Sequence, residues 1–168
     1  MKHFLIVVDM QRDFIDGSLG TPEAQAIVPH VVEKILQFDG EIFATLDTHA
    51  ENYLQTAEGR HLPVPHCIEN TDGWQIDPAL DPAGAMIFDK PSFGSEALVR
   101  YLKSLPDLQS AEFVGLCTDI CVITNVLSAK CALPELPISV DSACCAGVTP
   151  QSHENALSAM RTCQINIL

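Results

Sequence analysis

Short, mostly apolar runs alternate along the chain with longer segments in which apolar residues recur at helical spacing. The run from Phe4 to Val8 is rich in β-branched residues, which is typical of a strand buried on both faces. Between residues 23 and 38, apolar side chains can share one face of a helix. The expected strands are residues 4–8, 41–46, 84–88, 111–115, 137–140 and 164–168, and the expected helices are residues 23–38, 95–105, 118–133 and 150–160.

This alternation predicts an α/β fold in which a mostly parallel six-stranded sheet lies between two layers of helices, a three-layer α/β/α architecture. Residues 1–168 are expected to form a single domain, because the length suits one core and no linker or repeat interrupts it. Residues 50–83 break the pattern, since they are polar and hold several Pro and Gly residues. A long loop inside a compact domain usually carries function, so we expect a functional insertion there.

Reactive side chains follow several of the expected strands. Asp9, Asp47 and Lys90 each come directly or shortly after a strand, and Cys121 follows the turn after another. The carboxyl ends of parallel strands share one edge of a sheet, so these side chains are expected to converge. A carboxylate can accept the proton of a thiol, and a nearby ammonium group stabilises both the carboxylate and the thiolate. Alone, each residue has an ordinary alternative: a core cysteine, a turn aspartate or a solvated lysine.

The segment around Cys121 predicts a nucleophile at the start of a helix. Gly115 is expected where the chain turns after the strand, and Thr118 or Asp119 is expected to cap the helix that follows. Cys121 would then lie near the positive end of the helix dipole, which favours a thiolate. The spacing of Cys117 and Cys121 also suits half of a metal site, although the chain has no matching second pair.

Charge and composition restrict the partners. The net charge is −13, with 22 acidic and 9 basic residues, which disfavours nucleic acids and anionic membranes because both attract basic surfaces. No apolar run reaches membrane-spanning length and no signal peptide is recognisable. Seven cysteines, an odd number, suggest free thiols and a cytoplasmic location. We therefore expect a small-molecule substrate, with neither a nucleic acid nor a membrane as partner.

Three short motifs resemble those of one enzyme family. Residues 9–14 read DMQRDF and resemble a D-x-Q-x-D-F opening, while residues 90–93 read KPSF and resemble a K-x-x-[FY] segment. Residues 115–122 read GLCTDICV and resemble a G-x-x-T-[DN]-x-C-V nucleophile segment. In this order, each after an expected strand, they resemble the isochorismatase-like cysteine hydrolases, which include the nicotinamidases. A dinucleotide-binding module is disfavoured, because the G-x-G-x-x-G fingerprint is missing after the first strand.

The resemblance implies a catalytic role for each motif. Cys121 would attack a carbonyl carbon and form a thioester, Asp9 would take and return protons, and Lys90 would orient and polarise this pair. The oxyanion would be held by the backbone amides of Cys117 and Cys121, with a cis peptide between Leu116 and Cys117. Preorganised amides of this kind are worth about 3 kcal/mol each in the transition state.

The resemblance extends to a metal site in the long loop. Asp47, His49 and His66 resemble the D-x-H and later His of the nicotinamidases, and the favoured fourth ligand is Glu58, with His61 in reserve. Such a ligand set suits Zn²⁺, the first choice here, or Mn²⁺ or Fe²⁺.

The implied activity is that of a metal-containing cysteine amidohydrolase, a nicotinamidase that forms nicotinate and ammonia for NAD salvage. The metal would bind the pyridine nitrogen. An aromatic residue that often stacks on the pyridine is replaced by Pro63 or a neighbour, so Phe14, Phe93 or Trp74 is expected to supply the ring contact. The alternative is an isochorismatase-like hydrolase that acts on another small amide or a vinyl ether. The family often forms homo-oligomers, and the 47% hydrophobic content permits this.

Overall fold

The computed structural model describes residues 2–80 and 85–168, and its centre is a parallel β-sheet. Six strands lie in the order β3-β2-β1-β4-β5-β6. The strands are β1 (Lys2–Val8), β2 (Glu41–Asp47), β3 (Met86–Lys90), β4 (Leu108–Leu116), β5 (Ile138–Ala146) and β6 (Asn166–Ile167). The helices are α1 (Arg12–Ile15), α2 (Pro22–Gln37), α3 (Ala57–His61), α4 (Glu96–Ser104), α5 (Ile123–Ala132) and α6 (Pro150–Thr162), with a 3₁₀ turn η1 (Tyr53–Gln55) and a π-helical turn η2 (Thr118–Val122).

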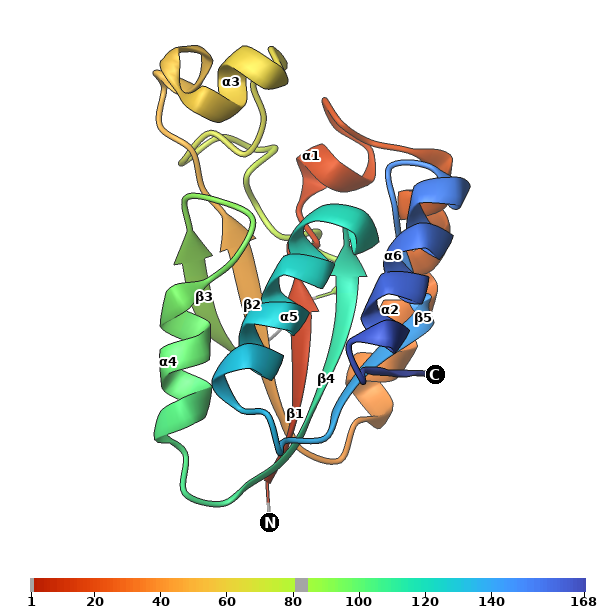
Figure 1. Cartoon of the computed structure of the whole chain (residues 1–168). Helices are drawn as coiled ribbons and strands as arrows, with labels where there is room; N and C mark the ends of the chain where they lie inside the picture. Colours follow the sequence, from red (N-terminus) through yellow and green to blue (C-terminus); the bar gives the residue numbers. More distant parts are fainter. Residues whose placement is uncertain (1, 81–84) are drawn as a thin grey trace.

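Alternate residues of each central strand enter two different cores. In β1, Phe4, Ile6 and Val8 pack in one cluster with side chains of α4, α5 and α6. Leu5 and Val7 point to the other face and pack with side chains of α2. Both faces are therefore buried, as the continuous apolar run requires, and Figure 1 shows the sheet between α4, α5 and α6 on one side and α2 on the other. The predicted three-layer α/β/α arrangement is confirmed, and the sheet is wholly parallel.

The carboxyl ends of the strands point to one edge of the sheet, at the top of Figure 1. The short helices α1 and α3 lie beyond this edge, and both come from segments that follow a strand. The fold thus places the residues after β1, β2, β3 and β4 in one region. In α/β sheets this edge is the usual location of a binding site.

The fifth strand is longer than its apolar run predicts. The expected strand of residues 137–140 continues to Ala146 at the end of β5, so Asp141 is a strand residue. The polar side chain is accommodated because Lys34 of α2 lies 2.6 Å from the carboxylate of Asp141 and 2.8 Å from that of Glu112. This partly buried ion cluster lets two acidic residues face a helix within the sheet.

Other boundaries differ by a few residues or by local structure. The third strand ends at Lys90 and not at Phe88, and its expected start at Gly84 lies outside the described residues. Within the expected loop of residues 50–83, the described part holds η1 and α3. The hydroxyl of Thr56 begins α3 by accepting a hydrogen bond from the amide of Gly59 at 3.0 Å.

Gly115 lies inside β4 and not at a turn after the strand. Its φ is +116°, a conformation that residues with a Cβ rarely adopt, and a Cβ built there would lie 2.1 Å from the carbonyl oxygen of Val8. We therefore expect Gly115→Ala to lower the free energy of unfolding by about 3 kcal/mol, through backbone strain and the clash with β1. Urea titration of both proteins measures this change, and equal midpoints would contradict it.

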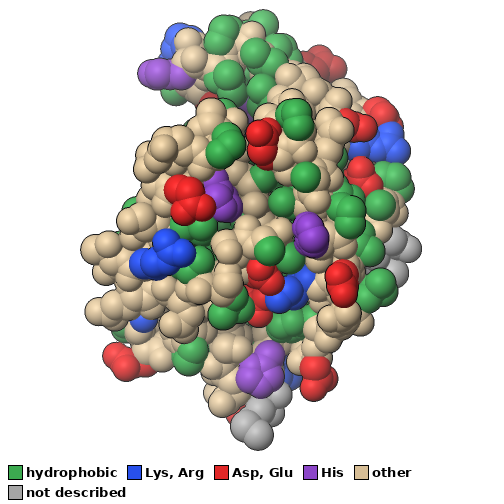
Figure 2. Space-filling model, turned by 90° about the vertical axis from the view of Figure 1, so that its right-hand side faces the viewer, with side chains coloured by type: hydrophobic (Ala, Val, Ile, Leu, Met, Phe, Trp, Pro, Cys, Tyr) green, Lys and Arg blue, Asp and Glu red, His purple; other side chains and the backbone are tan. Residues whose placement is uncertain are grey.

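The surface carries charges of both signs. Figure 2 shows Lys and Arg side chains scattered among acidic ones on one face of the molecule, without a continuous basic patch among the described residues there. Within residues 2–80 and 85–168, no helix combines the length and the apolar character that crossing a bilayer requires.

Candidate active site and metal site

An acid, an amine and a thiol meet at the carboxyl edge of the sheet. Asp9 follows β1 with a φ of 46°, Lys90 ends β3, and Cys121 lies in η2 after β4. The Lys90 Nζ is 2.6 Å from Asp9 Oδ2 and 3.5 Å from Cys121 Sγ. All three side chains are buried. The structure therefore brings together the three side chains that the sequence analysis placed at this edge.

The ammonium group of Lys90 is the centre of the electrostatic network. It also lies 3.3 Å from Asp47 Oδ1 and donates to the carbonyl of Ser92 at 2.9 Å. Burial lowers the pKa of Lys90, but the neighbouring Asp9 and Cys121 outweigh burial and raise the pKa above its ordinary value. Lys90 is therefore charged, and it compensates the buried acids on either side.

Asp9 is a buried carboxylate with two polar neighbours. Besides Lys90, it accepts a hydrogen bond from the hydroxyl of Thr45 at 2.6 Å. Burial raises the pKa of Asp9 above its ordinary value, against the opposing effect of Lys90. A carboxylate with a raised pKa is a stronger base than an exposed aspartate, which suits it to accept and return a proton.

The structure does not place Cys121 at a capped α-helix terminus. Cys117, not Thr118 or Asp119, stands at the cap position of η2, and the hydroxyl of Thr118 lies 2.8 Å from His153 Nδ1. Asp119 instead accepts a hydrogen bond from the amide of Val148 at 3.2 Å. Burial raises the pKa of the Cys121 thiol well above its ordinary value, and Asp9 adds to this. This shift opposes the thiolate that a helix terminus would favour, so Cys121 needs a base such as Asp9.

The backbone around Cys121 has two further features. The peptide between Leu116 and Cys117 is cis. Asn125, one turn beyond Cys121 on α5, is fully buried and donates to the carbonyls of Cys121 at 2.8 Å and Phe93 at 3.1 Å. The sequence analysis missed Asn125, although a polar residue four positions after the nucleophile on an apolar helix face was a usable signal.

Three of the four expected metal ligands form a compact cluster. Ligand atoms of Asp47, His49 and His66 all lie within 4.8 Å of one another, and all three residues are buried. Glu58 on α3 brings Oε1 to 3.7 Å from the Nε2 atoms of both histidines. His61 is exposed, and its Nδ1 lies 2.8 Å from a carbonyl of its own helix. The fourth position is therefore better suited to Glu58 than to His61.

The chemistry of this donor set fits a divalent cation. His66 Nδ1 lies 2.9 Å from the carbonyl of Val64, which can only accept, so Nδ1 carries the proton and Nε2 turns its lone pair to the cluster. His49 Nε2 is buried and has no hydrogen-bond partner among the described residues, although it lies 2.9 Å from Asp47 Oδ2. Burial raises the pKa of Asp47, but His49 and Lys90 lower it to a net value below the ordinary one, so the carboxylate is ionised.

One cavity of about 660 Å³ is lined by Cys121 and by Asp47, Glu58 and His66 of the metal cluster. Phe14 and Phe93 both line it, as expected, and the Phe14 ring centroid is 5.4 Å from that of His66. Trp74 is not among the described lining residues, since its indole donates to the hydroxyl of Thr48 at 2.8 Å. Much of the remaining wall is aliphatic and comprises Leu19, Ala24, Leu62, Leu116, Ile120 and Val148.

Comparisons with known proteins agree with this geometry. A family model described as the isochorismatase domain matches residues 3–168. The nicotinamidase of Escherichia coli (strain K12) is 30% identical over an alignment of 194 positions. The alignment covers 93% of this chain and 88% of the relative. The nicotinamidase/pyrazinamidase of Mycobacterium tuberculosis is 26% identical, with 98% and 97% covered. The structure of a pyrazinamidase of Pyrococcus horikoshii in complex with zinc superposes with a TM-score of 0.85 and 31% identity, covering 100% of this chain and 99% of that one.

Proposed function

The chain belongs to the isochorismatase family, and from this premise we propose that it is a nicotinamidase, which hydrolyses nicotinamide to nicotinate and ammonia. The observation that carries the proposal is that Cys121 lines one cavity together with Asp47 and His66 of the metal cluster. Lys90 contacts Cys121 at 3.5 Å and Asp9 at 2.6 Å, so the amine and the acid lie directly beside that thiol. The thiol, amine and acid suit cleavage of an amide through a thioester. The metal cluster suits a ring nitrogen, a ligand that divalent metals accept.

The reaction is expected to begin with the neutral thiol of Cys121. Asp9 takes the thiol proton as Sγ attacks the carbonyl carbon of the amide, and the same proton then passes to the departing nitrogen, which leaves as ammonia. A water molecule, deprotonated by Asp9, next attacks the thioester carbon. The C–S bond breaks, the acid leaves, and Asp9 returns the proton to the sulfur of Cys121. Lys90 lies within 3.5 Å of the sulfur and 2.6 Å of the carboxylate, so it stabilises negative charge on either group.

The negative charge on the substrate oxygen needs donors of its own. We assign this role to the backbone amides of Cys117 and Cys121, since both residues line the cavity and the cis peptide precedes the first of them. Phe14 and Phe93 are assigned to contact the ring, because both border the same space. Amides fixed by the fold stabilise an oxyanion without reorganisation.

Asp47, His49, His66 and Glu58 would hold a divalent metal, with zinc as the first choice. When bound, such a metal supplies a Lewis acid that anchors the ring nitrogen of the substrate. The residues around it keep their own tasks: Tyr53 packs against the rings of His49 and His66 at centroid distances of 4.8 and 4.9 Å, which fixes the orientation of both imidazoles.

Release of ammonia from nicotinamide by the zinc-loaded protein tests the proposal. We expect turnover of nicotinamide and of closely related pyridine and pyrazine carboxamides. A metal-loaded protein that is inert towards all of them would contradict it. In that case the aliphatic wall of the cavity would favour the second candidate, hydrolysis of another small amide or of a vinyl ether on the same scaffold.

The identity of the fourth metal ligand is open to a direct test. Glu58→Gln removes the carboxylate that lies 3.7 Å from the two imidazole nitrogens, so we expect zinc affinity to fall about 10- to 100-fold. His61→Ala should change it by less than about threefold, since its ring already bonds within α3. Titration of the metal-free proteins against a chromophoric chelator measures both values, and the reverse ranking would assign the ligand to His61.

The cytoplasm as location, a role in NAD salvage and the formation of homo-oligomers remain predictions from the sequence and from the family resemblance. Size-exclusion chromatography with light scattering tests the last of these.

A further inference from the structure

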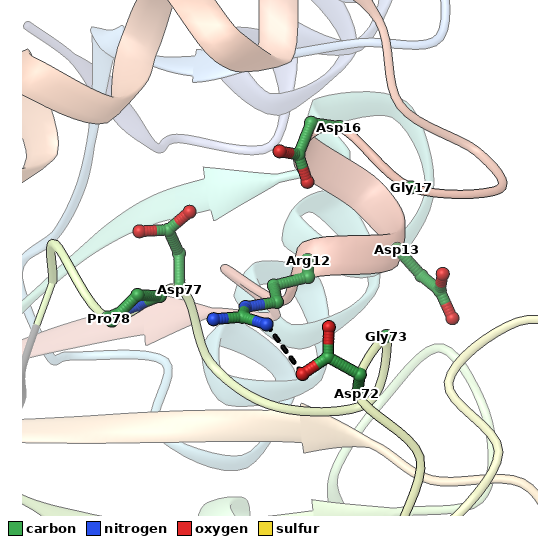
Figure 3. Close-up of a pocket in the computed structure, with 8 residues that line it drawn as sticks. All are labelled: Arg12, Asp13, Asp16, Gly17, Asp72, Gly73, Asp77 and Pro78. Carbon is green, nitrogen blue, oxygen red and sulfur yellow. Dashed lines mark hydrogen bonds and ion pairs between the residues drawn. The ribbon is translucent and has the colours of Figure 1, made fainter.

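The segment that follows β1 bonds backbone groups of the metal cluster and of its neighbours. Residues 10–13 run beside residues 73–77, with backbone hydrogen bonds from Arg12 to Gln75, from Asp13 to Gly73 and from Asp77 to Met10. A cavity of about 380 Å³ lies on the outer side of this pairing (Figure 3). Asp13 borders this cavity, and both Gln11 and Asp13 make contacts toward the metal cluster that the catalytic scheme does not use.

Gln11 holds the backbone of Asp47 at two points. Its Oε1 accepts from the Asp47 amide at 2.8 Å, and its Nε2 donates to the Asp47 carbonyl at 2.8 Å. Nε2 also donates to the carbonyl of Trp74 at 2.8 Å. The side chain is fully buried, so both amide hydrogens are used and no water competes. With both peptide groups of Asp47 fixed, its carboxylate is directed between His49 and Lys90.

Asp13 bonds the backbone next to His66, a second residue of the cluster. Its Oδ2 accepts from the amide of Cys67 at 2.7 Å, and this amide belongs to the peptide that joins Cys67 to His66. The carbonyl of Cys67 in turn accepts from the amide of His49 at 2.9 Å. Cys67 has a φ of 47°, which is unusual for a residue with a side chain, so the local backbone depends on such external bonds. The Asp13 carboxylate therefore fixes the peptide that follows His66, and the carbonyl of Cys67 then bonds the amide of His49.

We propose that Gln11 and Asp13 are positioning residues of the metal site, acting through Asp47 and through the peptide of His66. The inference rests on the proposed function, because it takes the cluster to be a metal site. The same short segment begins at Asp9, so it connects the general base of the reaction to the metal site that would bind the substrate ring. Groups that orient metal ligands in this way typically change metal affinity about 10- to 100-fold when they are removed.

Substitutions at the two positions allow matched comparisons. Gln11→Met keeps the length of the side chain but removes its three hydrogen bonds. Asp13→Leu removes the acceptor for Cys67, whereas Asp13→Asn keeps an acceptor oxygen in the same place. Arg12→Met is the control, since Arg12 points away from Asp13 in Figure 3 and, within residues 2–80 and 85–168, its side chain bonds only the exposed Asp72.

Zinc affinity of the metal-free proteins is measured by chelator competition, together with urea unfolding and the rate of Cys121 alkylation by iodoacetamide. We expect zinc affinity to fall about 10- to 100-fold in Gln11→Met and Asp13→Leu, and less than about threefold in Asp13→Asn and Arg12→Met. Alkylation of Cys121 should stay within about twofold of the wild-type rate, which a general loss of structure would not allow.

Unchanged zinc affinity in both Gln11→Met and Asp13→Leu would overturn the inference, and so would equal losses in Asp13→Leu and Asp13→Asn. If Gln11→Met fails to fold, the Asp13 pair still decides between the outcomes. A wild-type protein that binds no zinc would overturn the inference together with the metal site. A wild-type protein that binds zinc with the expected dependence on Gln11 and Asp13, yet does not hydrolyse nicotinamide, would contradict only the proposed function.

Discussion

Replacing Cys121 by Ala is expected to lower the release of ammonia from nicotinamide by at least about 10⁴-fold. Cys121 is the thiol that lies 3.5 Å from Lys90 Nζ, which in turn contacts the base Asp9 at 2.6 Å. The variant should fold, because the side chain is small and its neighbour Lys90 keeps its ion pair with Asp9 at 2.6 Å. Initial rates at saturating nicotinamide, with far-UV circular dichroism of each protein, measure both expectations.

Cys131→Ala is the matched control for this variant. Cys131 lies on α5, the helix that follows η2, and its side chain is exposed. Its removal should leave both turnover and zinc affinity unchanged. Substantial turnover by Cys121→Ala would remove the thiol from the mechanism, whatever the resemblance of the motifs.

The second large effect is expected for Asp9→Asn. The amide keeps the shape of the carboxylate and still accepts from Thr45, but it cannot take the proton of the Cys121 thiol, whose pKa is raised by burial. Loss of a general base typically costs about 10²- to 10⁴-fold, and we expect a loss of kcat in this range. Lys90 remains paired with Asp47 at 3.3 Å, so the variant should not leave a buried charge alone.

Asp16→Asn is the control for the loss of one negative charge, because Asp16 is exposed and lines the cavity of Figure 3. We expect wild-type kinetics from it. If Asp9→Asn kept a kcat within a few-fold of the wild type, another group would have to accept the proton, and the assignment of Asp9 would be wrong.

The alternation of strands and helices along the chain was enough to predict that the catalytic side chains converge. Phe4 to Val8 and the other apolar runs predicted parallel strands, and the residues after them had to meet at one edge. Asp9, Asp47, Lys90 and Cys121 therefore needed no knowledge of side-chain contacts to be grouped. The assignment of His66 to the same site depended on the family resemblance, because it lies in a loop whose path has no periodicity.

Local structure was harder to predict where polar contacts come from distant segments. Thr118 looked like a helix cap, but the chain forms a π-helical turn and its hydroxyl contacts His153. The extension of β5 through Asp141 could not be predicted, because its partner, Lys34, lies more than a hundred positions earlier. Gln11 and Asp13 belong to the first motif, but their roles could not be predicted, since their hydrogen bonds reach Asp47 and Cys67 across the fold. The spacing of the motif also could not show how deeply Cys121 is buried, and burial raises the pKa of its thiol.

The central claim is that an acyl group is transferred to Cys121 during turnover. Peptide mass spectrometry of the zinc-loaded enzyme, quenched in acid while it hydrolyses saturating nicotinamide, tests this most directly. The account predicts a nicotinoyl thioester on the peptide that contains Cys121, absent from unreacted enzyme and from Cys121→Ala. A nicotinoyl group on any other residue, Cys117 included, would contradict it.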